Sequence, residues 1–445
     1  MKTPIKKNFR SSARQVLILW GLVLWIFTPG LIGAYPLDAE PFTGIARLEG
    51  YRLAQEGKAR ARIQPPGALL PLDAVDLRLN NHPDLTLPPP DPRFTAQIKD
   101  LLGREADRYG IAVLDVTDPE NPRYAEHRSE VDHNPGSIGK LVVAIGVFQA
   151  LANIYPDDIA ARQYVLRASM IKADDFIQTD HHKVPLWNAD TGQMRYRPIQ
   201  IGDTANFYTY LDWMLSASSN AAASMVIREL MLLVHFGKNY PVTEAEIDAF
   251  FRDTPKSELS NLLLRALQDP LTRNGFDTDL LRQGGFFTWR GKQRVPGTSS
   301  RANARILMQF LLKLEQGKIV DPFSSREIKR LLYMTQRRIR YASSPALEDA
   351  AVYFKSGSLY KCRSEPGFKC GKYMGNVYNL LNSVAIVEHP AGERRLHYLV
   401  VVMSNVLRKN SAVAHQTLAT RIQRLMEAEY PVAVPAGKAG ADSEK

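Results

Sequence analysis

The sequence predicts an α+β fold. An antiparallel sheet flanked by helices is built from both ends of the chain, and an all-helical lobe lies between its halves. Apolar runs bounded by turn residues, typical of strands, occur in residues 111–127 and again in residues 351–403. Residues 150–335 mostly show helical periodicity. A helix precedes the first strands and another follows the last ones. This order is typical of a fold in which helices pack on one antiparallel sheet.

The elements can be taken in chain order. Residues 94–108 predict an amphipathic helix, and residues 111–116 and 123–127 a strand and its hairpin partner. Helices are expected in the lobe at residues 209–215, 221–236, 244–251, 258–267 and 301–316. The later strands are expected at residues 351–359, 383–388 and 397–403, and a helix at residues 414–429 closes a domain of residues 92–430. Residues 431–445 are a small-residue tail that we expect to be disordered.

Two further segments precede this domain. Residues 1–34 combine basic residues, a 13-residue apolar stretch and a small-residue end, which is the pattern of a secretory signal peptide cleaved after Ala34. The alternative is an uncleaved anchor over residues 16–34, barely long enough to span a membrane. Either interpretation predicts an exported protein, periplasmic or in the cell envelope, that contacts the membrane only through this segment. Residues 35–91 contain proline-rich pieces and predict an extension or linker packed on the main domain.

Composition excludes one class of partner and leaves another open. The chain has 445 residues, 45% hydrophobic and 23% charged, as ordinary globular proteins do. Its formal net charge of +11 suits an anionic partner such as an acidic envelope polymer. Because no dense Lys/Arg run is interleaved with aromatic residues, we do not expect nucleic-acid binding.

The only two cysteines, Cys362 and Cys370, bracket a Pro-Gly turn. In an exported protein this pair predicts a disulfide that closes a short loop, with free thiols as the alternative. No histidine lies near them in the sequence, so they do not predict a zinc site. We expect no metal and no cofactor.

The sequence Asn134-Pro135-Gly136-Ser137-Ile138-Gly139-Lys140 precedes an apolar run that predicts a buried helix. Ser137 would lie in its first turn, with Lys140 on the same face. A serine hydroxyl is a weak nucleophile until a neighbouring base takes its proton. Lys140 can be that base only if desolvation or another cation lowers its pKa.

Ser-x-x-Lys also occurs at Ser169 and at Ser358, but only the copy at Ser137 is followed by two further motifs. Ser218-Ser219-Asn220 comes 81 residues later (218 − 137), and Lys355-Ser356-Gly357 comes 137 residues after that (355 − 218). This order resembles class A β-lactamases and penicillin-binding proteins over residues 92–430.

The resemblance implies roles for these residues. Ser137 would be the nucleophile and Lys140 its base. Ser218 would pass a proton to the leaving nitrogen, and the Asn220 amide would hold the substrate. Taken alone, Ser218 and Asn220 would instead predict a helix cap. Lys355 would bind the substrate carboxylate and keep Lys140 deprotonated.

The rest of the third motif would bind the substrate. In the family's pattern Ser356 would belong to the substrate-binding strand, and Gly357 would let the backbone approach a ligand closely. The N–H groups of Ser358 and Ser137 would form a two-donor oxyanion hole.

One departure concerns deacylation. Class A β-lactamases carry a glutamate, four residues before an asparagine, that activates water. Glu258 comes nearest to this pattern, but its spacing to Asn261 is three. Its alternative interpretation is a solvated acid at a helix start. Residues 297–301 do resemble the class A order after that loop. The insertion between Ser137 and Ser218 contains Asp180-His181-His182, which we interpret as a polar surface loop rather than a metal site.

The resemblance therefore implies an exported serine hydrolase that opens β-lactams through an acyl-serine, with slow deacylation. The alternative is a D-alanyl-D-alanine carboxypeptidase or endopeptidase that acts on peptidoglycan stem peptides and needs no class A glutamate. A second alternative is a non-catalytic binding module of the cell envelope, against which the three intact motifs argue. The absent glutamate pattern discriminates between the first two.

Overall fold

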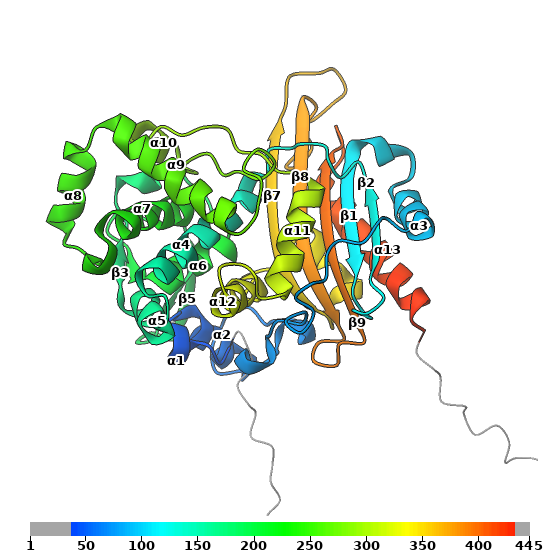
Figure 1. The fold of residues 1–445 in the computed structure, drawn as a ribbon, viewed down its shortest axis with the longest axis horizontal. Helices are drawn as coiled ribbons and strands as arrows, with labels where there is room; N and C mark the ends of the chain where they lie inside the picture. The colour runs from blue at the N-terminus through cyan, green and yellow to red at the C-terminus, as the bar shows by residue number, and fades with distance from the viewer. Residues whose placement is uncertain (1–36, 432–445) are drawn as a thin grey trace, which may run out of the picture. The chain divides into compact units, whose positions relative to one another are not determined.

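The computed structural model describes residues 37–431, so the expected signal peptide and nearly all of the tail lie outside the described residues. Its centre is a five-stranded antiparallel sheet with the order β2-β1-β9-β8-β7 (Figure 1). The strands are β1 Tyr109–Asp115, β2 Arg123–His127, β7 Ala351–Lys361, β8 Tyr378–His389 and β9 Leu396–Asn405. The first strand of the domain, β1, pairs with the last strand, β9, and β2 pairs with β1, so the sheet joins both ends of the domain, as predicted.

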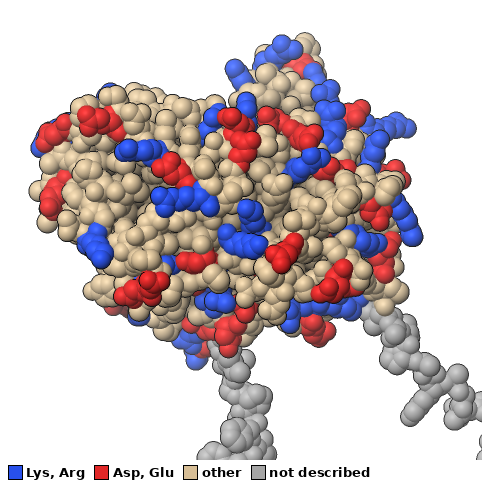
Figure 2. All heavy atoms as spheres, in the orientation of Figure 1, with Lys and Arg blue, Asp and Glu red and all other residues tan. Residues whose placement is uncertain are grey.

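Strands β7 and β8 continue into a hairpin that projects beyond the rest of the sheet (Figure 1). The hairpin loop carries the disulfide Cys362–Cys370, whose Cα atoms lie 6.2 Å apart, so the expected bridge forms. Basic side chains gather on this hairpin, whereas both signs of charge mix over the rest of the face drawn in Figure 2.

Each face of the sheet has its own helices, because side chains alternate along the strands. Ala112 and Leu114 of β1 belong to the core that also contains α11 Ala304–Glu315 and α12 Pro322–Tyr333. Their neighbours Ile111 and Val113 belong to the opposite core, with α3 Pro92–Leu102 and α13 Ser411–Glu429. The helix predicted at residues 94–108 ends earlier, at Leu102, and continues as a 3₁₀ turn, Gly103–Arg108.

The helical lobe contains most of the remaining helices. They are α4 Lys140–Ile154, α5 Ile159–Ala168, α6 Phe207–Leu215, α7 Asn220–Phe236, α8 Glu244–Asp253, α9 Lys256–Arg273 and α10 Trp289–Arg294. The lobe is not wholly helical as predicted. It also contains a two-stranded sheet of β3 Met170–Lys172 and β6 Thr204–Asn206, and a hairpin of β4 Val184–Asn188 and β5 Gln193–Arg197. These strands have three to five residues, too few for a clear two-residue periodicity.

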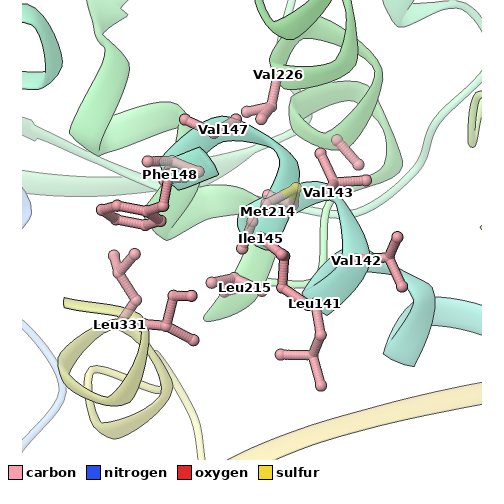
Figure 3. Close-up of a cluster of buried hydrophobic side chains, with 14 of the residues drawn as sticks. Leu141, Val142, Val143, Ile145, Val147, Phe148, Met214, Leu215, Val226 and Leu331 are labelled. Atoms are coloured by element: carbon pink, nitrogen blue, oxygen red, sulfur yellow. The ribbon is translucent and has the colours of Figure 1, made fainter. Parts of the chain in front are cut away.

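Helix α4 lies at the centre of this lobe. Its apolar side chains point in several directions and meet α6, α7 and α12 through Met214, Leu215, Val226 and Leu331 (Figure 3). Within residues 37–431, only Gly136–Ile154 is long and apolar enough to cross a membrane, and 72% of it is buried inside the protein. We therefore interpret it as a core helix that holds its first turn rigidly.

Residues 37–91 belong to the same core. They include the helices α1 Glu40–Thr43 and α2 Arg47–Gln55, and Ile45, Leu48 and Val75 are buried in the core cluster that also contains the lobe. Arg47 forms a fully buried ion pair with Asp212 of α6 at 2.6 Å. The segment is therefore built into the domain rather than acting as a flexible linker, and it can contribute to a site.

Candidate active site

Ser137 lies in a 3₁₀ turn, Gly136–Gly139, that runs directly into α4. The Nζ atom of Lys140 lies 3.1 Å from Ser137 Oγ. The one-turn spacing predicted this contact, although the turn is 3₁₀ rather than α-helical. Lys140 has no exposed surface, because α4 is enclosed by the lobe.

The other partners of Lys140 come from the second motif. Its Nζ lies 2.7 Å from the carbonyl oxygen of Ser218 and 2.8 Å from Asn220 Oδ1. A backbone carbonyl can only accept hydrogen bonds, and so can the amide oxygen. A neutral amine has two N–H bonds and one lone pair. If the N–H bonds serve these two oxygens, the lone pair is left for the hydroxyl proton of Ser137.

Lys140 and Lys355 both have lowered pKa values. Burial lowers the pKa of Lys140 to about 7, while Asp180 raises it and Arg340 lowers it. Burial holds the pKa of Lys355 well below its usual range, and the neighbouring Lys140 and Arg340 lower it further. The Nζ of Lys355 lies 2.9 Å from Ser218 Oγ and 3.0 Å from Ser356 O. The Ser218 hydroxyl therefore lies between two buried amines.

The turn that carries Ser218 is braced by Asp180. Ser218 has φ 58°, a left-handed conformation that non-glycine residues rarely adopt. The next residue, Ser219, is the N-cap of α7. Asp180 accepts hydrogen bonds from the Ser219 hydroxyl at 2.8 Å and from the Ala221 N–H at 2.9 Å. The expectation of a surface loop was wrong for Asp180, whose side chain is only 4% exposed, although His181 and His182 are exposed.

The third motif meets the first through two glycines. A Cβ on Gly357 would lie 2.1 Å from the carbonyl oxygen of Pro135 and 2.6 Å from the nitrogen of Ser137. A Cβ on Gly136 would lie 3.2 Å from the nitrogen of Ser358. Only glycine permits this approach of strand β7 to the serine turn. The backbone nitrogens of Ser137 and Ser358 therefore both lie where strand β7 contacts the serine turn.

A cleft of about 1660 Å³ opens over these residues. It is lined by Ser137, Ser218, Asn220, Ser356 and Ser358, with Lys140 and Lys355 buried behind them. Residues 297–300, which resembled the class A order, also line it.

Glu258 is not brought to this cleft. It is exposed near the start of α9 and lines a separate, shallow pocket with His235 and Phe250. The hypothesis that Glu258 activates the deacylating water therefore has no geometric support, and its alternative interpretation as a solvated acid at a helix start fits the structure.

Two residues of the site had no motif in the sequence. Arg340 has φ 55° and donates hydrogen bonds to the hydroxyls of Ser356 at 2.6 Å and Ser358 at 3.0 Å. Phe287 lies with its ring centroid 4.9 Å from Lys140 Nζ. Phe287 lies in a loop and Arg340 starts a 3₁₀ turn, Arg340–Ser343, both more than 100 residues away from Ser137, so local periodicity could not find them.

One group of side chains among the described residues has ligand atoms close enough for a metal ion: Glu315, Glu388 and His397. The Nζ of Lys329 lies 2.6 Å from Glu315 and 2.8 Å from Glu388. An ammonium group therefore already supplies the positive charge there, and we interpret the cluster as a buried ion-pair network.

The sequence and the fold can be compared with those of known proteins. No curated protein matches the sequence. Solved structures with a similar fold include PBP-A (14% identity, 77% of this chain and 100% of that chain, TM-score 0.46) and TLA-3 extended-spectrum beta-lactamase (13%, 75% and 98%, 0.48). Another is a class A beta-lactamase representative from Bacteroides cellulosilyticus DSM 14838 (14%, 76% and 98%, 0.44). The sequence profile of the beta-lactamase enzyme family matches residues 93–425. This match spans most of the chain, which therefore belongs to the beta-lactamase enzyme family and is a β-lactamase-like serine hydrolase.

Proposed function

We propose that this protein is an exported hydrolase that forms an acyl-enzyme at Ser137 and hydrolyses this acyl-enzyme slowly. The observation that carries the proposal is the environment of Lys140. Its amine is buried, contacts the Ser137 hydroxyl and has only uncharged oxygen atoms as its other close partners. Such an amine is a competent general base near neutral pH.

In the acylation step, Lys140 takes the hydroxyl proton of Ser137 while Oγ bonds to the amide carbonyl carbon. The N–H groups of Ser137 and Ser358 stabilise the oxyanion. When the carbon–nitrogen bond breaks, the leaving nitrogen takes the proton of the Ser218 hydroxyl. Lys140, 3.5 Å from Ser218 Oγ, returns its proton to that oxygen and becomes neutral again.

The substrate carboxylate binds beside strand β7. The hydroxyls of Ser356 and Ser358 and the guanidinium of Arg340 form one polar surface there. Lys355 lies behind it, and an approaching carboxylate favours its charged form. Asn220, which holds Lys140, also lines the cleft and can bind the substrate amide.

Deacylation is slow because the cleft offers the attacking water no carboxylate base. Within residues 37–431, no aspartate or glutamate lines the cleft. Phe287 instead covers Lys140 with an apolar ring that cannot accept a proton. This arrangement also supports the second candidate, a D-alanyl-D-alanine peptidase, which requires the same acylating residues. The disulfide Cys362–Cys370 supports export, because disulfides persist in oxidising compartments.

The test is a burst experiment with a chromogenic β-lactam, combined with intact mass. We expect a stoichiometric burst, a slow second phase and one adduct that is absent from Ser137→Ala. Fast turnover without a detectable adduct would contradict slow deacylation, and an adduct on Ser137→Ala would reject the nucleophile. Parallel incubation with a stem-peptide mimic separates the two candidates, because only a peptidase releases its terminal D-alanine.

The Phe287→Glu variant tests the cause of slow release. A carboxylate beside Lys140 would supply the absent base, and general-base catalysis contributes roughly 10²–10⁴-fold. We expect the acyl-enzyme to decay at least about tenfold faster. Phe287→Gln is the matched control, since it is polar and similar in size but cannot take a proton. Equal decay rates in the two variants would show that polarity or space, not a base, limits the release.

A further inference from the structure

The rim of the cleft carries seven cationic side chains, and none of the described residues that line it is acidic. The seven are Arg60, Arg62, Lys183, Lys292, Arg337, Arg340 and Lys372. They come from segments spread over most of the domain. Their convergence is therefore a property of the folded cleft and not of one basic run in the sequence.

None of these seven side chains forms an ion pair with a described residue, although basic residues beside them do. Helix α10 shows the difference directly. Arg290 and Arg294 bind Asp175 at 2.8 and 2.7 Å, whereas Lys292 lies between them in sequence, is exposed and lines the cleft. The positive charge of the rim is thus left uncompensated by the protein.

Contacts place three of these cations, Arg340, Lys372 and Arg60, on two different parts of the fold. Arg340 and Lys372 lie at the sheet side, where Arg340 stacks over Tyr373 at 4.7 Å and binds Ser356. Arg60 lies at the lobe side, where its backbone pairs with Gln193 of strand β5, and with Arg62 it forms the lobe-side group.

The lobe-side group is held by the N-terminal segment. The hydroxyls of Tyr51 in α2 and Tyr196 in β5 lie 3.1 Å apart, which fastens this segment to the lobe next to Arg60 and Arg62. The wall formed by residues 59–62 therefore has a defined place in the cleft.

From this distribution we infer that the natural substrate is an anionic peptide that carries at least one carboxylate besides the one bound beside Lys355. The inference rests on the proposed acyl-serine function and adds a substrate class to it. Arg340 and the Lys355 motif suffice for a single carboxylate. Arg60 and Arg62 form the lobe-side group, and a second carboxylate is the group in a peptide that would pair with them.

A cleft lined by one sign of charge also raises the local concentration of oppositely charged substrate, and salt weakens this effect. The preference for an anionic over a neutral substrate should therefore decrease as ionic strength rises. The acylation step at Ser137 should not itself discriminate between anionic and neutral substrates.

The experiment compares two β-lactams that share one nucleus, one with a neutral side chain and one whose side chain carries a carboxylate. We expect wild type to acylate faster with the second. Arg60→Ser/Arg62→Ser should reduce the ratio of the two rates about tenfold, since two cations that face the ligand are lost. Arg104→Ser/Arg108→Ser removes two exposed arginines outside the cleft and is the matched control, for which the ratio should not change.

A ratio near one in wild type, or equal losses with both β-lactams in the variant, would overturn the inference. If neither compound acylates Ser137, the proposed function fails instead. Binding to Ser137→Ala then decides the inference separately. Calorimetry with this variant compares two D-alanyl-D-alanine peptides, one containing a glutamate where the other has a glutamine. The glutamate peptide should bind more tightly. Equal affinities would overturn the inference.

Discussion

Two buried lysines, Lys140 and Lys329, have no exposed surface, but the structure surrounds them differently. Lys329 of α12 contacts two carboxylates, Glu315 and Glu388, at 2.6 and 2.8 Å. Lys140 contacts uncharged groups: the hydroxyls of Ser137 and Ser218, a carbonyl oxygen, an amide oxygen and the ring of Phe287. A buried amine beside carboxylates is held as a charged structural group. A buried amine among uncharged acceptors can lose its proton and act as a base.

The neighbours of each lysine show the same contrast. Burial alone would raise the pKa of the Glu388 carboxyl. The neighbouring Lys329, followed by His397 and Arg78, outweighs burial and lowers this pKa to about 2. The Glu388 carboxyl is therefore ionised in the folded protein. The described hydrogen-bond partners of Lys140 include no carboxylate, and the ring beside its Nζ is the apolar Phe287. The three following predictions test whether this difference in partners separates a structural lysine from a catalytic one.

The largest effect is expected for Lys140→Ala. Loss of the general base should lower the acylation rate at Ser137 roughly 10²–10⁴-fold or more, while the protein stays folded. Stopped-flow acylation with a chromogenic β-lactam measures the rate, and circular dichroism checks the fold. Acylation within about threefold of wild type would mean that Lys140 is not the base.

Lys329→Met should mainly affect stability. Removing this ammonium leaves Glu315 and Glu388 buried without their closest cation, which costs about 3–5 kcal/mol in the free energy of unfolding. Lys140→Met is the matched control, because it leaves no carboxylate unpaired and should change stability much less. Urea unfolding of both variants measures the difference. Equal losses of stability would show that the two buried lysines are not distinct in kind.

The smallest effect is a shift in pH dependence. Because Lys140 is active when neutral and has a pKa of about 7, the acylation rate should rise as pH increases through that value. Asp180 raises the pKa of Lys140, so Asp180→Asn should move the rise to lower pH. Arg340 lowers it, so Arg340→Gln should move the rise to higher pH.

Arg340→Lys keeps the charge and is the control for this experiment. The position of the pH profile is the readout, because loss of Arg340 also weakens substrate binding and so lowers the rate at every pH. Profiles that coincide in Asp180→Asn and Arg340→Gln would assign the pH dependence to another group.

Sequence reasoning was most accurate where the signal is local. Strand β2 begins and ends at the predicted residues, Arg123 and His127, and helix α7 begins within one residue of the prediction. The contact between Ser137 and Lys140 needs only one helical turn. The short strands β3 to β6 were missed, because their few residues lie between helices and are held by partners that their own sequence does not specify.

Glu258 shows the opposite failure. Its position three residues before Asn261 resembles the class A pattern of a glutamate before an asparagine. Helix α9 nevertheless exposes Glu258 to solvent, away from the cleft. Sequence spacing cannot report which face of a helix packs on the lobe when several faces carry polar residues. Asp180 was misjudged for the same reason, because its burial depends on the N-terminus of α7, 40 residues later.

The sequence by itself determined the fold class, the three motifs and the pairing of Ser137 with Lys140, since these depend on periodicity and on contacts within a turn. Only the tertiary structure decided which other groups reach the cleft: Arg340, Phe287 and the cations of residues 60 and 62. An arginine at the rim has the same local sequence character as one on any other surface. Its role follows from packing between segments far apart in the chain, which local propensity does not encode.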